Sequence, residues 1–388
     1  MPLPPVYGHV RARAMLASAA RAGNLSQSLL VHGPAGIGKE RMAMWLAQVV
    51  VCEQRRADGA PCGECRDCRM IDRLEHPDVH WFFPLPRPDA ATPEKLRDKL
   101  EEARGVELVA RRENPQHVPQ YEKAPAYFMG TIQNLQRLAG MKPAVGRRKV
   151  FVVGDAEAMV PQESSPEAAN AFLKLLEEPP ADTTLVLTSS NPGALLATIR
   201  SRVLPIRLLR LSVDEVAAYL AREVKMPEAE ARALAVSSEG AIGRALRMLP
   251  SGGGAGSYQK LRETGRELLA AALADSDAAR FAAANAVAPA GARGDFTAGL
   301  EALALWLRDL MAIAAGAGDA LAYASGGDEA LLRKWAARPG LHAGGVASAI
   351  LKVQEAQDLA SGNVNPQLIL ADLLRGLRNE LTGAGPAR

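Results

Sequence analysis

The sequence lacks any apolar run that approaches the length of a membrane span. A membrane crossing needs about 20 consecutive apolar residues, and a secretory signal needs a charged stretch followed by an apolar one. The chain opens instead with Met-Pro-Leu-Pro-Pro. We therefore expect a protein without a membrane partner that works in the reducing cytoplasm, where disulfides are rare.

An excess of charge of one sign is also lacking, and aromatic residues are few. Lys and Arg number 46 against 43 acidic residues, a net charge of +3, and aromatic residues make up 4% of the chain. A protein that binds nucleic acid by itself usually carries a clear basic excess and rings on which bases stack. Any DNA contact is therefore expected to be local or shared with partners.

The length and the apolar content suffice for two or three domains. The chain has 388 residues, of which 48% are apolar. Up to about residue 210, short apolar strands alternate with helical segments, which predicts an α/β fold with a parallel sheet. The expected strands span residues 28–32, 79–83, 149–153, 184–188 and 203–208.

The rest of the chain predicts helices only. Residues 211–250 indicate three short helices that open at Ser212, Pro227 and about Ala241, a small helical lid, and Ser212 forms a capping box with Glu215. The Gly- and Ser-rich residues 251–257 predict a flexible joint. From residue 258 to 388 apolar residues recur at helical spacing, notably over 296–314 and 343–359, which predicts an all-α C-terminal domain.

Residues 84–127 are the least informative part of the sequence. A proline-rich stretch precedes a charged helical segment over residues 94–104. We interpret residues 84–127 as a solvated surface insertion, with a DNA or partner contact as the alternative. Arg147, Arg148 and Lys149 are likewise interpreted as a charged surface turn.

All four cysteines lie within residues 52–68, as Cys52, Cys62, Cys65 and Cys68. Four thiolates at this spacing can form a tetrahedral shell around Zn²⁺, and the metal supplies folding energy that a short insert cannot obtain from its own core. The sequence therefore predicts a structural zinc module. The last three cysteines also match part of a ferredoxin-type iron–sulfur motif, but the fourth lies upstream and no Cys-Pro follows. Iron–sulfur ligation and plain thiols or disulfides are the less favoured alternatives.

A glycine-rich turn joins the strand 28–32 to a helical pattern over residues 42–51. The turn runs Gly33, Pro34, Ala35, Gly36, Ile37, Gly38, Lys39, Glu40. Glycines let backbone N–H groups face an anion, and the lysine reaches the outer phosphates, so the pattern predicts a P-loop. Glu40 stands where a Ser or Thr hydroxyl normally holds Mg²⁺. Bound ATP with Mg²⁺ is therefore one alternative, and a loop that only shapes the fold is the other.

The strand 149–153 leads into the second half of such a site. Asp155 could orient Mg²⁺ through water. Ala156 occupies the position where ATPases of this kind carry the glutamate that polarises the attacking water, and Glu157, one residue further on, is expected to point elsewhere. With Glu40 and Ala156 two catalytic parts are missing, which predicts a P-loop domain that does not hydrolyse ATP by itself.

Three consecutive segments resemble signatures of the AAA+ clamp-loader subunits of bacterial DNA polymerase III. They are Asn-Ala-Phe-Leu-Lys-Leu-Leu-Glu-Glu-Pro-Pro at 170–180, Thr-Leu-Val-Leu-Thr-Ser-Ser at 184–190 and Thr-Ile-Arg-Ser-Arg-Val at 198–203. Glu40, Ala156 and Gly243, which stands where the motor subunit carries a nucleotide-sensing arginine, favour the delta-prime branch over the tau/gamma branch. The resemblance covers most of the chain, from Tyr7-Gly8-His9 to Asn363-Val-Asn-Pro366, and includes the four-cysteine module.

This resemblance implies a domain plan and a function. It implies an AAA+ domain over residues 1–210, the lid over 211–250 and a helical collar over 258–388. It further implies a largely non-hydrolysing subunit in a pentameric ring with delta and tau/gamma subunits. That ring loads the sliding clamp onto primer-template DNA during DNA replication.

Arg202, in Ser201-Arg202-Val203, would be the arginine finger that acts on a neighbour's ATP, and Val203 replaces the family's usual cysteine. Two other functions are weighed against this one. The first is an ATP-hydrolysing tau/gamma-type motor, which Lys39 and Asp155 favour. The second is a free-standing zinc-dependent nucleic-acid-binding protein.

Overall fold

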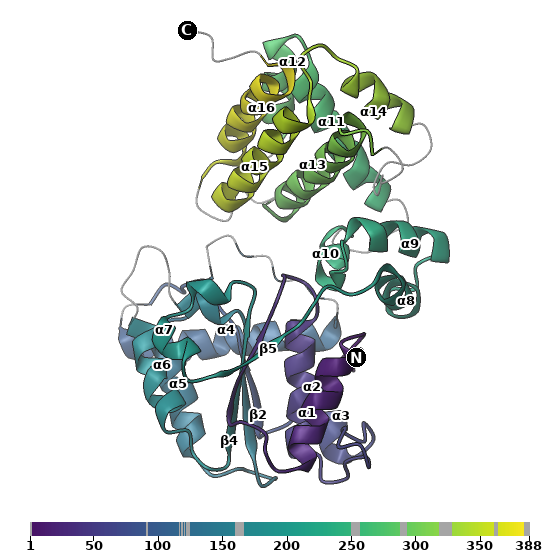
Figure 1. The fold of residues 1–388 in the computed structure, drawn as a ribbon. Helices are drawn as coiled ribbons and strands as arrows, with labels where there is room; N and C mark the ends of the chain where they lie inside the picture. The colour runs from purple at the N-terminus through teal and green to yellow at the C-terminus, as the bar shows by residue number, and fades with distance from the viewer. Residues whose placement is uncertain are drawn as a thin grey trace. The chain divides into compact units, whose positions relative to one another are not determined.

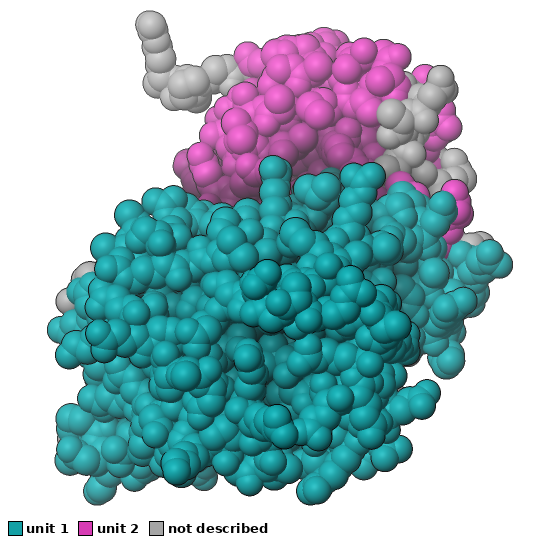
Figure 2. Space-filling view, turned by 60° about the horizontal axis from the view of Figure 1, so that its bottom comes forward, with its two compact units in different colours: residues 1–121, 125–231, 239–244 teal, residues 122–124, 232–238, 245–388 magenta. Residues whose placement is uncertain are grey.

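The computed structural model describes residues 2–90, 92–115, 117, 119, 121, 125–159, 167–249, 257–287, 293–317, 328–360 and 364–383. The described chain forms two compact units, coloured separately in Figure 2. Unit 1 comprises residues 1–121, 125–231 and 239–244, and unit 2 comprises residues 122–124, 232–238 and 245–388. The predicted joint at 251–257 lies outside the described residues except for Ser257.

Unit 1 is built on a parallel sheet of five strands in the order β2-β3-β4-β1-β5. The strands are β1 (Ser28–His32), β2 (Val79–Phe82), β3 (Lys149–Val153), β4 (Thr183–Ser189) and β5 (Leu204–Arg207). Helices lie on both sides of this sheet in Figure 1. The predicted α/β architecture is therefore confirmed, with strand ends that differ by one or two residues.

Alternate residues of the strands face the two helical layers. Val150 and Val152 of β3 belong to one apolar cluster, and Phe151 and Val153 belong to the other. A strand buried on both faces favours apolar residues at successive positions, which explains the apolar run of residues 150–153 in β3. The first cluster is covered by α1 (Val10–Arg21), α2 (Lys39–Val51), α3 (Arg66–Asp72) and α4 (Pro93–Glu113). The second is covered by α5 (Met129–Gly140), α6 (Glu167–Glu177) and α7 (Ala197–Arg200).

The prediction of a charged surface turn at residues 147–149 is wrong for Lys149. Arg147 and Arg148 are exposed, but only 2% of Lys149 is accessible to solvent. Its Nζ donates hydrogen bonds to the carbonyl oxygens of Ala139, at 2.6 Å, and Met141, which end α5. A buried ammonium group needs such acceptors, and carbonyls at a helix C-terminus carry partial negative charge. Lys149 therefore joins β3 to α5.

The predicted insertion over residues 84–127 is not simply a solvated surface segment. The charged helix expected at 94–104 continues to Glu113 as α4, which begins at the side-chain cap of Thr92. Leu100 and Arg111 of α4 are buried, whereas Val106 and Val109 are exposed. One face of α4 thus packs on unit 1 and the other faces solvent.

The lid helices begin near the predicted positions. They are α8 (Val213–Glu223), α9 (Glu228–Ser237) and α10 (Ile242–Arg247). The capping box is present, because Ser212 Oγ accepts from the Glu215 N–H at 3.2 Å and Glu215 Oε2 accepts from the Ser212 N–H at 2.8 Å.

Unit 2 contains the C-terminal helices and, within its described residues, no strand. They are α11 (Ser257–Leu273), α12 (Asp277–Asn285), α13 (Arg293–Ala314), α14 (Asp328–Ala336), α15 (Ala343–Ala360) and α16 (Pro366–Thr382). Gly265 lets α11 approach α13 closely, since a Cβ there would lie 2.8 Å from the Ala302 carbonyl carbon. Within the described ranges, no helix has both the length and the apolar character of a membrane span.

Asp78 offers a test of the fold of unit 1. Its carboxylate is buried and accepts hydrogen bonds from the N–H groups of Val145, at 2.9 Å, and Gly146, at 2.8 Å, in the turn that leads to β3. Burial raises the pKa of Asp78, but the backbone donors outweigh burial and hold that pKa below its ordinary value. We expect Asp78→Ala to lower the free energy of unfolding by about 2 kcal/mol at neutral pH.

Urea unfolding against pH checks this prediction. A lowered folded-state pKa contributes stability above the unfolded-state pKa, and this stability is lost as pH falls through the folded-state value. The cost of Asp78→Ala should therefore shrink below about pH 4. Asp98→Ala, which removes a carboxylate whose side chain is 73% exposed, is the control and should cost little. A cost of Asp78→Ala that did not change with pH would contradict the assignment.

Candidate functional site: a cysteine cluster and a phosphate loop

The four cysteines converge as the sequence predicts. Their Sγ atoms all lie within 4.8 Å of one another. The Cys52–Cys62 sulfur pair is 3.6 Å apart, and the Cys52–Cys65 and Cys62–Cys68 pairs are each 3.9 Å apart. Zn–S bonds of about 2.3 Å in a tetrahedron place sulfurs roughly 3.8 Å apart. The cluster thus has the dimensions of a zinc shell, and these sulfurs are too far apart for a disulfide.

Backbone N–H groups of the module favour the thiolate form of Cys62, which is the form that binds metal. Cys62 Sγ accepts from the N–H groups of Glu64, at 3.5 Å, and Cys65, at 3.3 Å. Burial raises the pKa of the Cys62 thiol, but these donors outweigh it and lower the pKa to about 6. Burial raises the pKa of Cys52 and Cys68, and a bound cation would offset this effect by favouring thiolates. The residues present therefore fit Zn²⁺.

The phosphate loop also folds as predicted, between β1 and α2. Gly33, Gly36 and Gly38 have φ angles of 146°, 77° and 93°, which favour glycine. At Gly33 a side chain is excluded as well, since its Cβ would lie 2.4 Å from the Leu208 carbonyl oxygen. Gly38 is the N-cap of α2, so the helix N-terminus opens at the loop.

The loop lysine is engaged within its own unit. Lys39 is 6% exposed, and its Nζ donates to the Pro34 carbonyl oxygen at 3.0 Å and to Ser190 Oγ at 2.8 Å. The tip of the loop meets the lid, where the Gly243 N–H donates to the Gly36 carbonyl oxygen at 2.7 Å. A Cβ on Gly243 would lie 2.8 Å from Gly36 Cα, so this contact needs glycine.

Glu40 makes an ion pair instead of offering a hydroxyl. Its Oε2 lies 3.7 Å from Nη1 of Arg111, which comes from α4. Burial raises the pKa of Glu40 to about 7, and Arg111 and Lys39 act against burial, whereas Asp155 and Glu107 add to it. With a carboxylate already paired at this position, the residues present do not fit the usual Mg²⁺ site of a P-loop.

Residues 154–157 follow β3, and they begin beside Glu40. Gly154 faces Glu40, since a Cβ on Gly154 would lie 2.5 Å from Glu40 Oε1. Asp155 is exposed with φ at 43°, and its N–H donates to Thr188 Oγ1. Its role as a magnesium ligand stays a prediction. Ala156 is fully buried.

Glu157 engages the turn after β4, and its predicted direction away from the loop stays a prediction. Its Oε1 accepts hydrogen bonds from the N–H groups of Ser190, at 2.8 Å, and Asn191, at 3.2 Å. The carboxylate thereby fixes the turn that follows β4.

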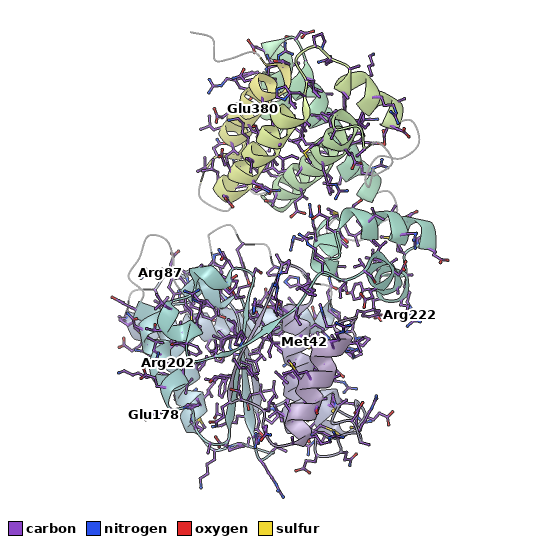
Figure 3. The ribbon with its side chains drawn as sticks, viewed as in Figure 1. Met42, Arg87, Glu178, Arg202, Arg222 and Glu380 are labelled. Carbon is purple, nitrogen blue, oxygen red and sulfur yellow. The ribbon has the colours of Figure 1, made fainter. Side chains whose placement is uncertain are left out.

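Arg202 lies away from the loop, after α7 and beside α6 (Figure 3). Its side chain is 34% exposed, and its Nη2 lies 2.7 Å from Oε1 of Glu177. Its Nη1 donates to the Thr198 carbonyl oxygen at 2.9 Å. Val203, the residue that replaces a cysteine, is buried.

Two residues that define the surroundings of the loop, Ser190 and Arg111, lie outside its sequence motif. Ser190 could have been found, because it directly follows a strand that pairs in parallel with β1, and such strands end at the same edge of a sheet. Arg111 gave no signal, because it lies far from the loop in sequence and contacts it only through the packing of α4.

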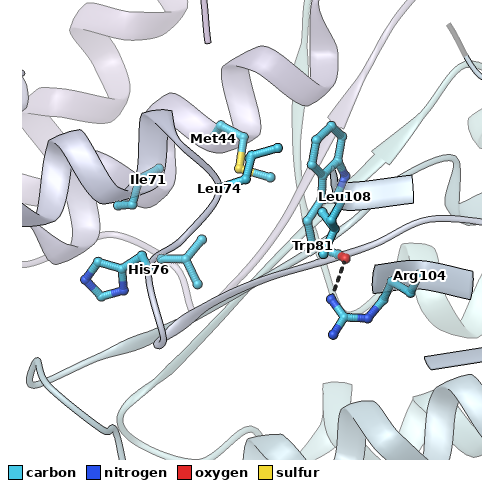
Figure 4. A pocket seen from close by; sticks show the side chains of 8 residues that line it. Met44, Ile71, Leu74, His76, Trp81, Arg104 and Leu108 are labelled. Atoms are coloured by element: carbon cyan, nitrogen blue, oxygen red, sulfur yellow. Dashed lines mark hydrogen bonds between the residues drawn. The ribbon is translucent and has the colours of Figure 1, made fainter. Parts of the chain in front are cut away.

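A small cavity beside the loop helix is not a ligand site. It measures about 30 Å³ and is lined by residues that include Met44, His76, Trp81 and Arg104 (Figure 4). Arg104 Nη1 donates to the Trp81 carbonyl oxygen at 3.2 Å at its edge. This volume holds about one water molecule, whereas ligand pockets measure roughly 300 to 1,000 Å³.

The zinc module can be tested by removing one ligand. Cys65→Ser leaves a three-ligand shell, so we expect weaker zinc retention and loss of protection of residues 52–72 against proteolysis, while the sheet survives. Elemental analysis after gel filtration and limited proteolysis measure both effects. Glu64→Gln, which keeps every thiol, should retain zinc. Iron in the fresh protein, or no zinc in it, would contradict the assignment.

Comparison with known proteins places these features in one family. The model of the family described as DNA polymerase III, delta subunit, matches residues 8–212, more than half of the chain. The delta' subunit of DNA polymerase III from Pseudomonas aeruginosa is 35% identical over 177 residues, which cover 46% of this chain and 41% of that protein. The delta' subunit from Escherichia coli is 28% identical over 262 residues, which cover 68% of this chain and 64% of that protein.

These matches span less than two thirds of the length of each relative. Among solved structures, a gamma subunit-related protein of DNA polymerase III from Thermotoga maritima covers 94% of this chain and 99% of its own, at 18% identity and a TM-score of 0.40. The family match rests on the sequence, and by it this chain belongs to the delta-prime family of DNA polymerase III clamp-loader subunits.

Proposed function

We propose that this chain is a delta-prime-type subunit of the replicative clamp loader. In this role it is a largely non-hydrolysing scaffold that supplies Arg202 to the ATP site of a neighbouring subunit. The complete complex then opens the sliding clamp and places it on primed DNA during replication. Family membership supports this general role. The geometry of Lys39 and Arg202 supports the proposal that this chain supplies an arginine and that a neighbouring subunit hydrolyses the ATP.

The contrast between Lys39 and Arg202 carries the proposal. Lys39 is buried and donates to groups of its own unit, and Glu40 beside it is paired with Arg111. Arg202 keeps 34% of its side chain exposed, and its partner Glu177 is 48% exposed. The chain thus has a loop that is engaged internally and an arginine that an adjacent molecule can reach.

An arginine in this position can act on another subunit's nucleotide. A guanidinium at the γ-phosphate stabilises the charge of the transition state, and in GTPases such fingers contribute on the order of 10³ to 10⁵ in rate. The ion pair with Glu177 must be given up for this contact. An exposed pair is worth only about 0 to 1 kcal/mol, so a phosphate dianion can displace it.

The proposed partners follow from the family. We propose delta and tau/gamma subunits as neighbours in a pentameric ring, with residues 258–388 as the collar. Several large apolar side chains of these helices are exposed, namely Phe281, Leu351, Leu359 and Leu368. Contact with other subunits would cover them. The zinc module is a structural part of the subunit in this proposal.

We predict that the isolated chain hydrolyses ATP no faster than background. Glu40 removes the hydroxyl that holds Mg²⁺, and the fully buried Ala156 offers no carboxylate to orient water. Steady-state phosphate release by the purified chain, compared with Lys39→Ala, measures this. Turnover that Lys39→Ala abolishes would instead support a motor subunit of the tau/gamma type.

We predict that Arg202→Ala assembles normally but lowers the ATPase and clamp-loading rates of the complete complex. The loss should be smaller than the full finger effect, because other sites in the ring keep working. Arg200→Ala removes an exposed arginine two residues away and is the matched control, with a much smaller effect expected. Unchanged loading by an assembled Arg202→Ala complex, at saturating ATP and primed DNA, would show that this chain does not complete its neighbour's site.

DNA binding by the isolated chain tests the remaining candidate function. A free-standing zinc-dependent nucleic-acid-binding protein should bind primed DNA tightly without partners. We expect the isolated chain to bind it weakly, because its charge is nearly balanced.

A further inference from the structure

This inference concerns the chain's own phosphate loop and rests on the proposed function, in which that loop does not hydrolyse ATP. In a working P-loop, Mg²⁺ is held between a hydroxyl on the first turn of the loop helix and an acid after a neighbouring strand. Residue 40 occupies the first position and carries a carboxylate. Gly154 faces residue 40 so closely that a Cβ there would lie 2.5 Å from Glu40 Oε1. Position 154, rather than Asp155, therefore opposes Glu40.

The guanidinium of Arg111 places a positive charge beside Glu40. Arg111, near the C-terminal end of α4, is 8% exposed. Its guanidinium carbon lies 4.2 Å from the ring centres of both Trp81 and Phe83. Its Nε donates to Glu107 Oε1 at 2.8 Å, and its Nη1 lies 3.7 Å from Glu40 Oε2. Two rings and two carboxylates thus fix a group that stays charged at every accessible pH.

Glu40 needs such a cation. Burial raises its pKa to about 7, Asp155 and Glu107 add to this, and Arg111 is the larger of the two cationic effects that oppose it. The other cation, Lys39, donates to Pro34 and Ser190. Tyr127, whose hydroxyl donates to the Gly154 carbonyl oxygen at 2.6 Å, brings no charge to the site at neutral pH. Neither does Tyr121, because burial raises its pKa to about 12. The Nε2 of His117 lies 3.2 Å from Glu107 Oε1.

We propose that Arg111 is an internal cation that replaces Mg²⁺ in this loop. The carboxylate at this place comes from the helix side, at Glu40, and Gly154 on the strand side leaves room for it. The positive charge comes from α4 instead of from solution. The inserted helix thereby keeps the metal position of the loop filled, which gives residues 93–113 a role.

A double-mutant cycle on the full-length, zinc-loaded chain tests this replacement. The variants are Arg111→Gln, Glu40→Gln and the double variant, and the readout is the melting temperature between pH 5 and pH 8. We expect Arg111→Gln to lower the melting temperature at pH 8, because the half-buried Glu40, whose side chain is 34% exposed, then loses its cation. In the Glu40→Gln background the same change should lower the melting temperature much less, because no half-buried carboxylate is left without its cation.

The pH profile separates this role from packing alone. A folded-state pKa that is raised above the unfolded value gives stability that is lost as pH rises through the folded-state value. The loss caused by Arg111→Gln should therefore grow from pH 5 to pH 8, and Glu40→Gln should abolish that growth. Arg111→Lys, which keeps the charge, should restore a large part of the stability at pH 8.

Arg112→Gln is the matched control. Arg112 is the next residue of α4 and donates from Nη2 to the Leu74 carbonyl oxygen at 2.6 Å. Its loss should lower the melting temperature without coupling to Glu40 and without this pH dependence. Additive effects of Arg111→Gln and Glu40→Gln at pH 8 would overturn the inference and leave the proposed function intact. Lys39-dependent ATP turnover would instead overturn the proposed function and this inference together.

Discussion

The parallel pairing of β1, β3 and β4 is the constraint on which the rest of unit 1 depends. Because the strands run in the same direction, their carboxyl ends meet at one edge of the sheet. The loop after β1, the residues after β3 and Ser190 after β4 are therefore neighbours, although up to about 150 positions separate them. The engagement of Lys39 and the approach of Gly154 to Glu40 both follow from this edge.

Features set by local sequence could be predicted well. The strands, the phosphate loop and the capping box at Ser212 depend on patterns within a few residues, and the structure has them near the expected positions. The cysteine cluster could also be predicted, because ligand spacing along the chain nearly fixes the ligand geometry.

Features set by distant contacts could not be predicted. Lys149 looks like part of a basic surface run, and only the end of α5 gives it buried acceptors. The helix expected to end at residue 104 continues past Gly105, because α4 packs along unit 1, and this packing brings Arg111 to the loop. The residue that opposes Glu40 depends on the exact course of the turn after β3, which the sequence pattern does not specify.

The loop helix α2 is held at both of its ends. At its start lie Lys39 and Glu40 with their long-range partners, and near its end Gln48 Nε2 donates to the Cys68 carbonyl oxygen at 3.1 Å inside the cysteine module. Helices normally fray from their termini, and amide hydrogens there exchange with solvent first. Neither end of α2 is free to do so, and its side chains are almost all buried. The helix is about 20 Å long. Amide exchange along its whole length should therefore require global opening of unit 1, and α2 should belong to the slowest-exchanging core of that unit.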